Sequence, residues 1–144
     1  MRFLSLLLLL TLGGCSSDSG CSDRVLEIRA DLEGPLVAWR YVRDCGATTD
    51  TSMNIAVGPR EAGLAGATLV FMADSNLGAA EMDGLIDQGP NIWVEMTWTR
   101  AHNLSVAYAR KARVFRSIPE AAGATIVYRG TTRNVMLPPP PPPS

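Results

Sequence analysis

The stretch that decides the fold is residues 36–43, which read LVAWRYVR. In an extended chain Val37, Trp39 and Tyr41 fall on one face, and Arg40 points to the opposite face. This period of two, carried by β-branched and aromatic residues, is typical of a β-strand. The segment therefore predicts a strand with one apolar face.

The same alternation recurs on both sides of this strand. It marks residues 25–30, 92–98 and 103–109, and residues 52–57, 68–73, 112–116 and 125–129 are expected to form further short strands. In 92–98, Ile92, Val94, Met96 and Trp98 are expected inward and Glu95 outward. No crossover helices separate these segments, which disfavours a parallel α/β sheet. The sequence predicts an all-β fold, a small antiparallel β-sandwich or strongly bent sheet of about eight short strands.

The N-terminus has the layout of a secretory signal. Arg2 precedes an apolar run that is shorter than the roughly 20 residues needed to span a bilayer. Residues 12–15, Leu-Gly-Gly-Cys, resemble the bacterial lipobox. The resemblance implies cleavage before Cys15 and lipid attachment to its thiol, with two or three acyl chains holding the protein at the membrane. The alternative is an ordinary secretory signal that happens to contain Cys15.

These features divide the chain into four parts. We expect a lipoprotein signal peptide with its helix over 1–14, a lipidated cysteine and flexible tether over 15–20, a β-rich domain over 21–137, and a polyproline tail over 138–144. Serines follow Cys15, and no Asp adjoins it. This resembles the sorting signal of lipoproteins at the outer membrane, facing the periplasm. The tail is a stiff rod that either docks on an aromatic groove of a partner or has no partner.

Composition excludes several classes of protein. The chain has 144 residues, of which 47% are hydrophobic, enough for one ordinary domain. Its 13 Lys and Arg nearly balance its 14 Asp and Glu, which argues against nucleic-acid binding. One His and three Cys leave little for a metal site, and the sequence predicts neither a metal nor a cofactor.

Two cysteines remain once Cys15 is assigned to lipid. An even pair in an exported chain is most simply a disulfide, here between Cys21 and Cys45. Two free thiols or a redox pair are the alternatives. The spacing is unlike Cys-x-x-Cys, and two sulfurs are too few for a typical zinc site.

Three blocks resemble a family of small exported bacterial proteins, many with lipoprotein signals. They are YVRDCGATT at 41–49, DSNLGAA at 74–80 and YARKARVF at 108–115. Relatives often carry His where this chain has Leu77. The family also tends to place a cysteine where Cys21 stands, which supports the disulfide. It has no established activity, so the resemblance implies fold and location only.

His102 is the single imidazole, and it falls in a segment typical of a hairpin turn. A Ser–His–Asp triad would need His102 beside Ser105 or Ser117 and an acid, but no Gly-x-Ser-x-Gly elbow exposes a nucleophile. We therefore predict no catalytic residue.

Residues 74–91 are expected to form a long surface loop rich in oxygen ligands. Its polar members are Asp74, Asn76, Glu81, Asp83 and Asp87. Calcium binding is one interpretation, and a solvated loop is the other, because the EF-hand pattern is absent. A carboxylate pair between Asp74 and Glu95 would be needed for a glycosidase-like site.

A basic cluster follows near the C-terminal end of the domain, at Arg110, Lys111, Arg113 and Arg116. It either faces anionic lipid or polysaccharide, caps the acidic loop, or is a solvated face. The hydroxyls of Thr48, Thr49, Thr51 and Ser52 are expected to satisfy turn backbone.

The sequence favours a non-catalytic binding or structural module, anchored in the cell envelope. Its predicted partners are the membrane, through the lipid, and an envelope protein or polysaccharide. The candidate binding surface comprises Asp74, Asn76, Arg110, Lys111 and Arg113. The alternatives are an envelope hydrolase that uses acids of the 74–91 loop, and a protein inhibitor or immunity factor.

Overall fold

The computed structural model describes residues 20–80 and 91–132. The predicted signal peptide, Cys15, most of the tether, residues 81–90 and the polyproline tail lie outside these ranges. Within them, no helix combines the length and the apolar character needed to cross a bilayer.

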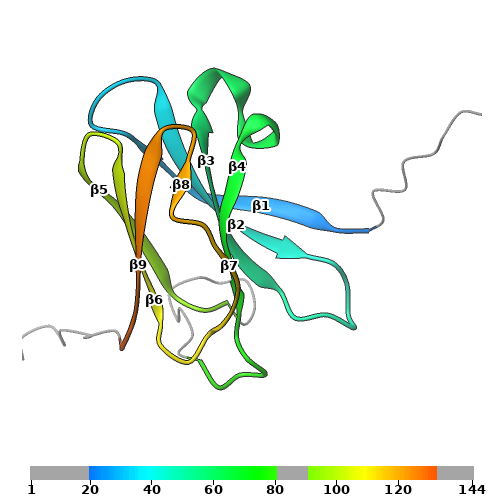
Figure 1. Cartoon of the computed structure of the whole chain (residues 1–144). Helices are drawn as coiled ribbons and strands as arrows, with labels where there is room; N and C mark the ends of the chain where they lie inside the picture. Colours follow the sequence, from blue (N-terminus) through cyan, green and yellow to red (C-terminus); the bar gives the residue numbers. More distant parts are fainter. Residues whose placement is uncertain (1–19, 81–90, 133–144) are drawn as a thin grey trace, which may run out of the picture.

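The described residues form two β-sheets, which confirms the all-β prediction (Figure 1). The larger sheet has the strand order β1-β2-β3-β4-β7, and the smaller has the order β5-β6-β9-β8. The larger sheet comprises β1 (Ser22–Ala30), β2 (Leu36–Asp44), β3 (Ser52–Pro59), β4 (Thr68–Asp74) and β7 (Arg113–Ser117). The smaller comprises β5 (Val94–Arg100), β6 (Asn103–Ala109), β8 (Glu120–Ala121) and β9 (Ala124–Thr131). Two short 3-10 helices, η1 (Arg60–Ala62) and η2 (Leu64–Gly66), lie between β3 and β4.

One strand pair departs from the antiparallel expectation. β6 and β9 run parallel, whereas the other pairs of described strands are antiparallel. After β6 the chain crosses to the larger sheet as β7, which pairs with β4, and returns through the β8–β9 hairpin. A parallel pair needs a crossover of a dozen or more residues, and here a strand of the other sheet supplies it in place of a helix.

The main core lies between the two sheets. Its largest fully buried side chains include Phe71 of β4 and Met96 of β5. The Phe71 ring also contacts two tyrosines of the smaller sheet, with centroids 5.1 Å from Tyr108 and 5.8 Å from Tyr128. Ile92 is buried although β5 begins only at Val94, so the inward face predicted for 92–98 is correct, but its first residues are not in the strand.

A second, smaller core covers part of the outer face of the larger sheet. Val37, Trp39 and Tyr41 share one face of β2, as predicted, but they pack against Leu64 and Ala67 of the β3–β4 connection. Gly58 permits this close approach, because a Cβ there would lie 3.0 Å from the Cα of Ala67. β2 is therefore buried on both faces.

The disulfide between Cys21 and Cys45 is confirmed. Ser22 pairs with Asp44 in the β1–β2 ladder, so the two cysteines face each other one position further out, with Cα atoms 3.9 Å apart. The disulfide closes the open end of the β1–β2 hairpin.

Candidate functional site

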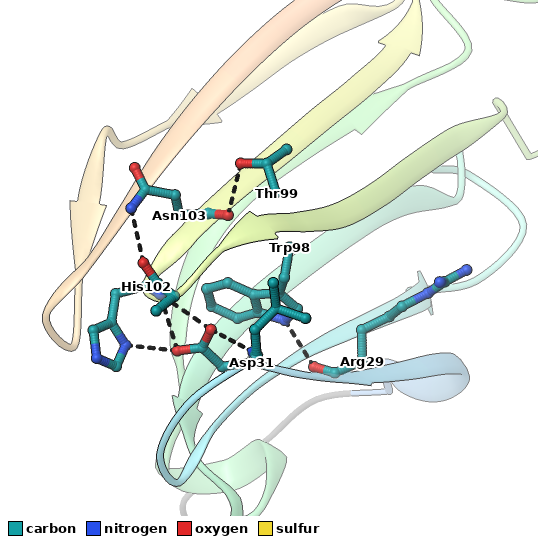
Figure 2. Close-up of polar contacts among 8 residues, drawn as sticks. Arg29, Asp31, Trp98, Thr99, His102 and Asn103 are labelled. Atoms are coloured by element: carbon teal, nitrogen blue, oxygen red, sulfur yellow. Dashed lines mark hydrogen bonds and ion pairs between the residues drawn. The ribbon is translucent and has the colours of Figure 1, made fainter.

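A buried contact joins two hairpin turns that belong to different sheets (Figure 2). Asp31 directly follows β1, and its side chain is 0% exposed. His102 lies in the β5–β6 turn in the left-handed conformation, with φ of 58°. The imidazole Nδ1 is 2.6 Å from Asp31 Oδ2, and the backbone N–H of His102 donates to both carboxylate oxygens at 3.0 and 3.1 Å.

Two further hydrogen bonds complete this contact. The backbone N–H of Leu32 donates to Asp31 Oδ1 at 2.7 Å. The indole N–H of Trp98 donates to the carbonyl of Arg29 at 3.0 Å. Within the residues that the structure describes, no hydroxyl or thiol hydrogen-bonds to the His102 ring. The pair is thus an Asp–His contact without a nucleophile, and its role is to hold the β1–β2 hairpin against the β5–β6 hairpin.

The predicted binding residues centre on an ion pair between β4 and β7. Asp74 ends β4 and pairs in register with Arg113, the first residue of β7. Arg113 Nε lies 3.2 Å from both carboxylate oxygens, and Nη2 also donates to Oδ2. This hydrogen bonding to Asp74 raises the pKa of Arg113 above its ordinary value. The basic cluster therefore caps the start of the acidic loop through Arg113.

The loop after β4 is fixed by its own polar groups. The backbone N–H of Asn76 donates to Asp74 Oδ1 at 2.8 Å, and its side-chain amide donates to the carbonyl of Lys111 at 3.1 Å. The N–H of Gly78 donates to the Ser75 hydroxyl at 3.0 Å. These bonds hold Asn76 and Leu77 in the left-handed conformation, with φ of 51° and 57°. For a bulky residue such as leucine this conformation is strained.

An open hollow of 410 Å³ lies beside the ion pair. Its lining includes Thr48, Thr49 and Ser52, around the β2–β3 loop, together with Leu77, Arg113 and Phe115. We call it the β4–β7 hollow. The guanidinium carbon of Arg113 lies 5.1 Å from the centroid of the Phe115 ring, within the range of a cation–π contact.

The β4–β7 hollow brings together the three sequence blocks that are far apart in the chain. Residues 41–49 contribute Thr48 and Thr49, residues 74–80 contribute Asp74 and Leu77, and residues 108–115 contribute Arg113 and Phe115. The contacts have a simple cause, because β4 lies between β3 and β7 in the sheet.

Other predicted residues fall in different places. Arg110 and Lys111 are exposed in the turn between β6 and β7. This turn lies beside the loop after β4, because the Asn76 amide donates to the Lys111 carbonyl. Arg116 pairs with Met72 in the β4–β7 ladder. Glu81, Asp83 and Asp87 lie outside the described residues. Within the described ranges, no group of three or more His, Cys, Asp or Glu is placed to hold a metal ion.

The two acids of the glycosidase-like alternative face away from each other. Glu95 alternates with the buried Val94 and Met96, so it points outward from the smaller sheet. Asp74 follows the buried core residue Ala73, so it lies on the outer face of the larger sheet. The sandwich separates the two carboxylates.

The hydroxyls near the disulfide have mixed roles. Thr49 Oγ1 donates to the carbonyl of Gly46 at 3.3 Å, as expected for a turn, whereas Thr51 Oγ1 donates to the side chain of Asn91 at 3.1 Å.

The sequence interpretation did not include Phe115 in the binding surface. Its alternation with Val114 would have placed it on the same face as Arg113.

Comparison of the chain with protein-family models, with curated proteins and with solved structures gave no match.

Proposed function

We propose that this protein is a lipid-anchored lipoprotein of the cell envelope that acts as a non-catalytic binding module. In this proposal Cys15 carries the lipid, the domain faces the periplasm from the outer membrane, and the β4–β7 hollow contacts another envelope component. The lipobox-like residues 12–15 support the anchor. The disulfide between Cys21 and Cys45 supports an oxidising compartment.

The observation that carries the binding role is the combination of exposed apolar side chains with the Asp74–Arg113 ion pair in the β4–β7 hollow. Leu77 is 83% exposed and Phe115 is 52% exposed, although burial would stabilise both. Asp74 is buried and accepts hydrogen bonds from Arg113 and from the N–H of Asn76. These bonds commit the carboxylate to holding Arg113 and the loop after β4 in place, which is consistent with a binding surface.

The proposed anchor limits how far the domain can move from the membrane. Residues 16–20 connect Cys15 to the first cysteine of the domain. A fully extended chain of this length reaches roughly 20 Å. A partner in this proposal must therefore lie no further from the membrane surface than the tether length plus the width of the domain.

The anchor is tested with Cys15→Ser and the matched control Ser17→Ala, expressed as full-length chains in a diderm bacterium. We expect Ser17→Ala to take up labelled palmitate and to sediment with outer membranes. Cys15→Ser is expected to incorporate no label and to leave the membrane fraction. Equal membrane retention of both variants would exclude the lipid anchor.

The binding role is tested with the Cys15→Ser chain, which lacks the proposed lipid. It is mixed with washed envelopes from cells that do not express the protein, and the bound fraction is measured by sedimentation. We expect Leu77→Asn, added to this background, to lower the bound fraction. Val127→Ala is the control, since Val127 is 61% exposed in the other sheet. Equal binding by both double variants would remove the β4–β7 hollow from the proposal.

A further inference from the structure

We propose that the β4–β7 hollow binds a pyranose ring within a neutral polysaccharide of the envelope. The C–H face of the sugar would lie against Phe115 and Leu77, and its hydroxyls would bond to Arg113 and to the hydroxyls of the β2–β3 loop. This rests on the proposed binding function and names its ligand.

The apolar part of the hollow suits the C–H face of a sugar. Phe115 is the largest exposed aromatic side chain in the described residues, and it lines the same hollow as Leu77. Leu77 is held there in a strained conformation with φ of 57° and contributes little to the core. Strain that the surrounding hydrogen bonds maintain is characteristic of binding sites.

The polar part offers both donors and acceptors. Arg113 commits Nε and Nη2 to Asp74, which leaves Nη1 to donate to a ligand. Ser52 Oγ accepts from the Asn54 amide at 2.9 Å, so its own proton can be donated. Ligand hydroxyls both donate and accept, and they match this mixture better than a group that only accepts.

The charge of the hollow favours a neutral ligand. Asp74 and Arg113 neutralise each other, and the remaining charged side chain in the lining is Asp50. The lining therefore carries no excess of positive charge with which to hold a phosphate or carboxylate ligand.

Size and shape agree with one ring of a longer chain. A volume of 410 Å³ is at the lower end of the roughly 300–1,000 Å³ of ligand clefts. The hollow is open to solvent, so one ring of a longer chain can lie in it. Two other hollows, of 440 and 500 Å³, are similar in size. The first has no aromatic lining, and in the second the aromatic residue, Tyr41, is buried.

The test is saturation-transfer NMR on the full-length lipidated protein in detergent micelles. The probes are tetrasaccharides of N-acetylglucosamine and of glucose. We expect transfer from the protein to sugar ring protons. Phe115→Ala should weaken the affinity about tenfold, since loss of an aromatic face removes a contact of that order. Val127→Ala should leave it unchanged.

A second variant separates binding from folding. Asn adopts the left-handed conformation more readily than Leu, so Leu77→Asn should keep or raise the thermal midpoint while weakening sugar binding several-fold. A parallel loss of stability and binding would assign Leu77 a structural role and overturn this part of the proposal.

Three results would overturn the saccharide assignment. These are no transfer to either tetrasaccharide at roughly 10 mM, tighter binding of inorganic phosphate, or stronger transfer to a neutral Ala-Gly peptide than to the sugars. The Cys15→Ser chain should bind the sugars as well as the lipidated protein does. Failure of the anchor is therefore distinguishable from failure of the sugar site.

Discussion

Substitution of Asp31 by Ala should destabilise the domain by about 3 kcal/mol, because a buried carboxylate joins the two hairpins. The side chain is 0% exposed and accepts from the His102 ring, the His102 backbone N–H and the Leu32 N–H. Hydrogen bonds to charged groups are each worth about 1.5–3 kcal/mol. The hydrogen bond from the His102 ring contributes least to stability, since that side chain is 49% exposed and can hydrogen-bond to water instead. The two backbone donors supply most of the effect.

The matched variant is His102→Asn. It removes the ring, keeps the backbone N–H that donates to Asp31, and places a residue that tolerates positive φ at the turn. We expect a loss of at most about 1 kcal/mol, because only the half-exposed ring contact disappears. Asp31→Ala should therefore cost more than twice as much as His102→Asn.

Urea unfolding followed by tryptophan fluorescence, with the disulfide intact, measures both values. Trp98 donates to the carbonyl of Arg29 beside this contact and gives a local signal. In thermal unfolding the Asp31→Ala loss corresponds to a fall in the midpoint of about 10 to 20 °C for a domain of this size. A loss below about 0.5 kcal/mol for Asp31→Ala, or equal losses for the two variants, would refute this reasoning.

Further predictions concern the disulfide and one half-buried tyrosine. The disulfide between Cys21 and Cys45 spans a sequence separation of 24 residues, so its reduction should lower the unfolding free energy by about 3 kcal/mol. Urea unfolding curves with and without reductant measure this difference. Coincident curves would contradict the prediction. The Tyr128 hydroxyl lies 2.9 Å from the Val70 carbonyl and 2.7 Å from the Ile118 carbonyl. Tyr128→Phe should therefore lower the unfolding free energy by about 1 kcal/mol in the same assay. An unchanged urea midpoint would refute the contact. Burial raises the pKa of Tyr128 from 10.0 to about 12. The contribution of the neutral Tyr128 hydroxyl to stability should be complete below pH 10 and should fall as the pH rises toward 12. Parallel titrations followed by phenolate absorbance and by circular dichroism measure this. Equal loss of stability by a Tyr128→Phe chain over the same range would contradict the prediction.

The sequence by itself determined where eight of the nine described strands lie, all except the two-residue β8, and it favoured the pairing of Cys21 with Cys45. Alternation of apolar and polar residues is a local property, so 36–43 could be recognised as a strand without knowledge of its neighbours. The disulfide followed from the pairing of the two remaining cysteines, and the β1–β2 hairpin brings Cys21 and Cys45 face to face.

Only the tertiary structure decided which face of each strand meets which partner. Trp39 and Tyr41 cover the outside of the larger sheet because residues 60–67 fold back over them, and alternation cannot distinguish this face from the main core. The parallel pairing of β6 with β9 depends on the route of the chain through β7. Asp31 lies in the turn after β1, yet its carboxylate contacts a turn 71 positions away in the chain. Such contacts join residues distant in the chain, and local patterns carry no information about them.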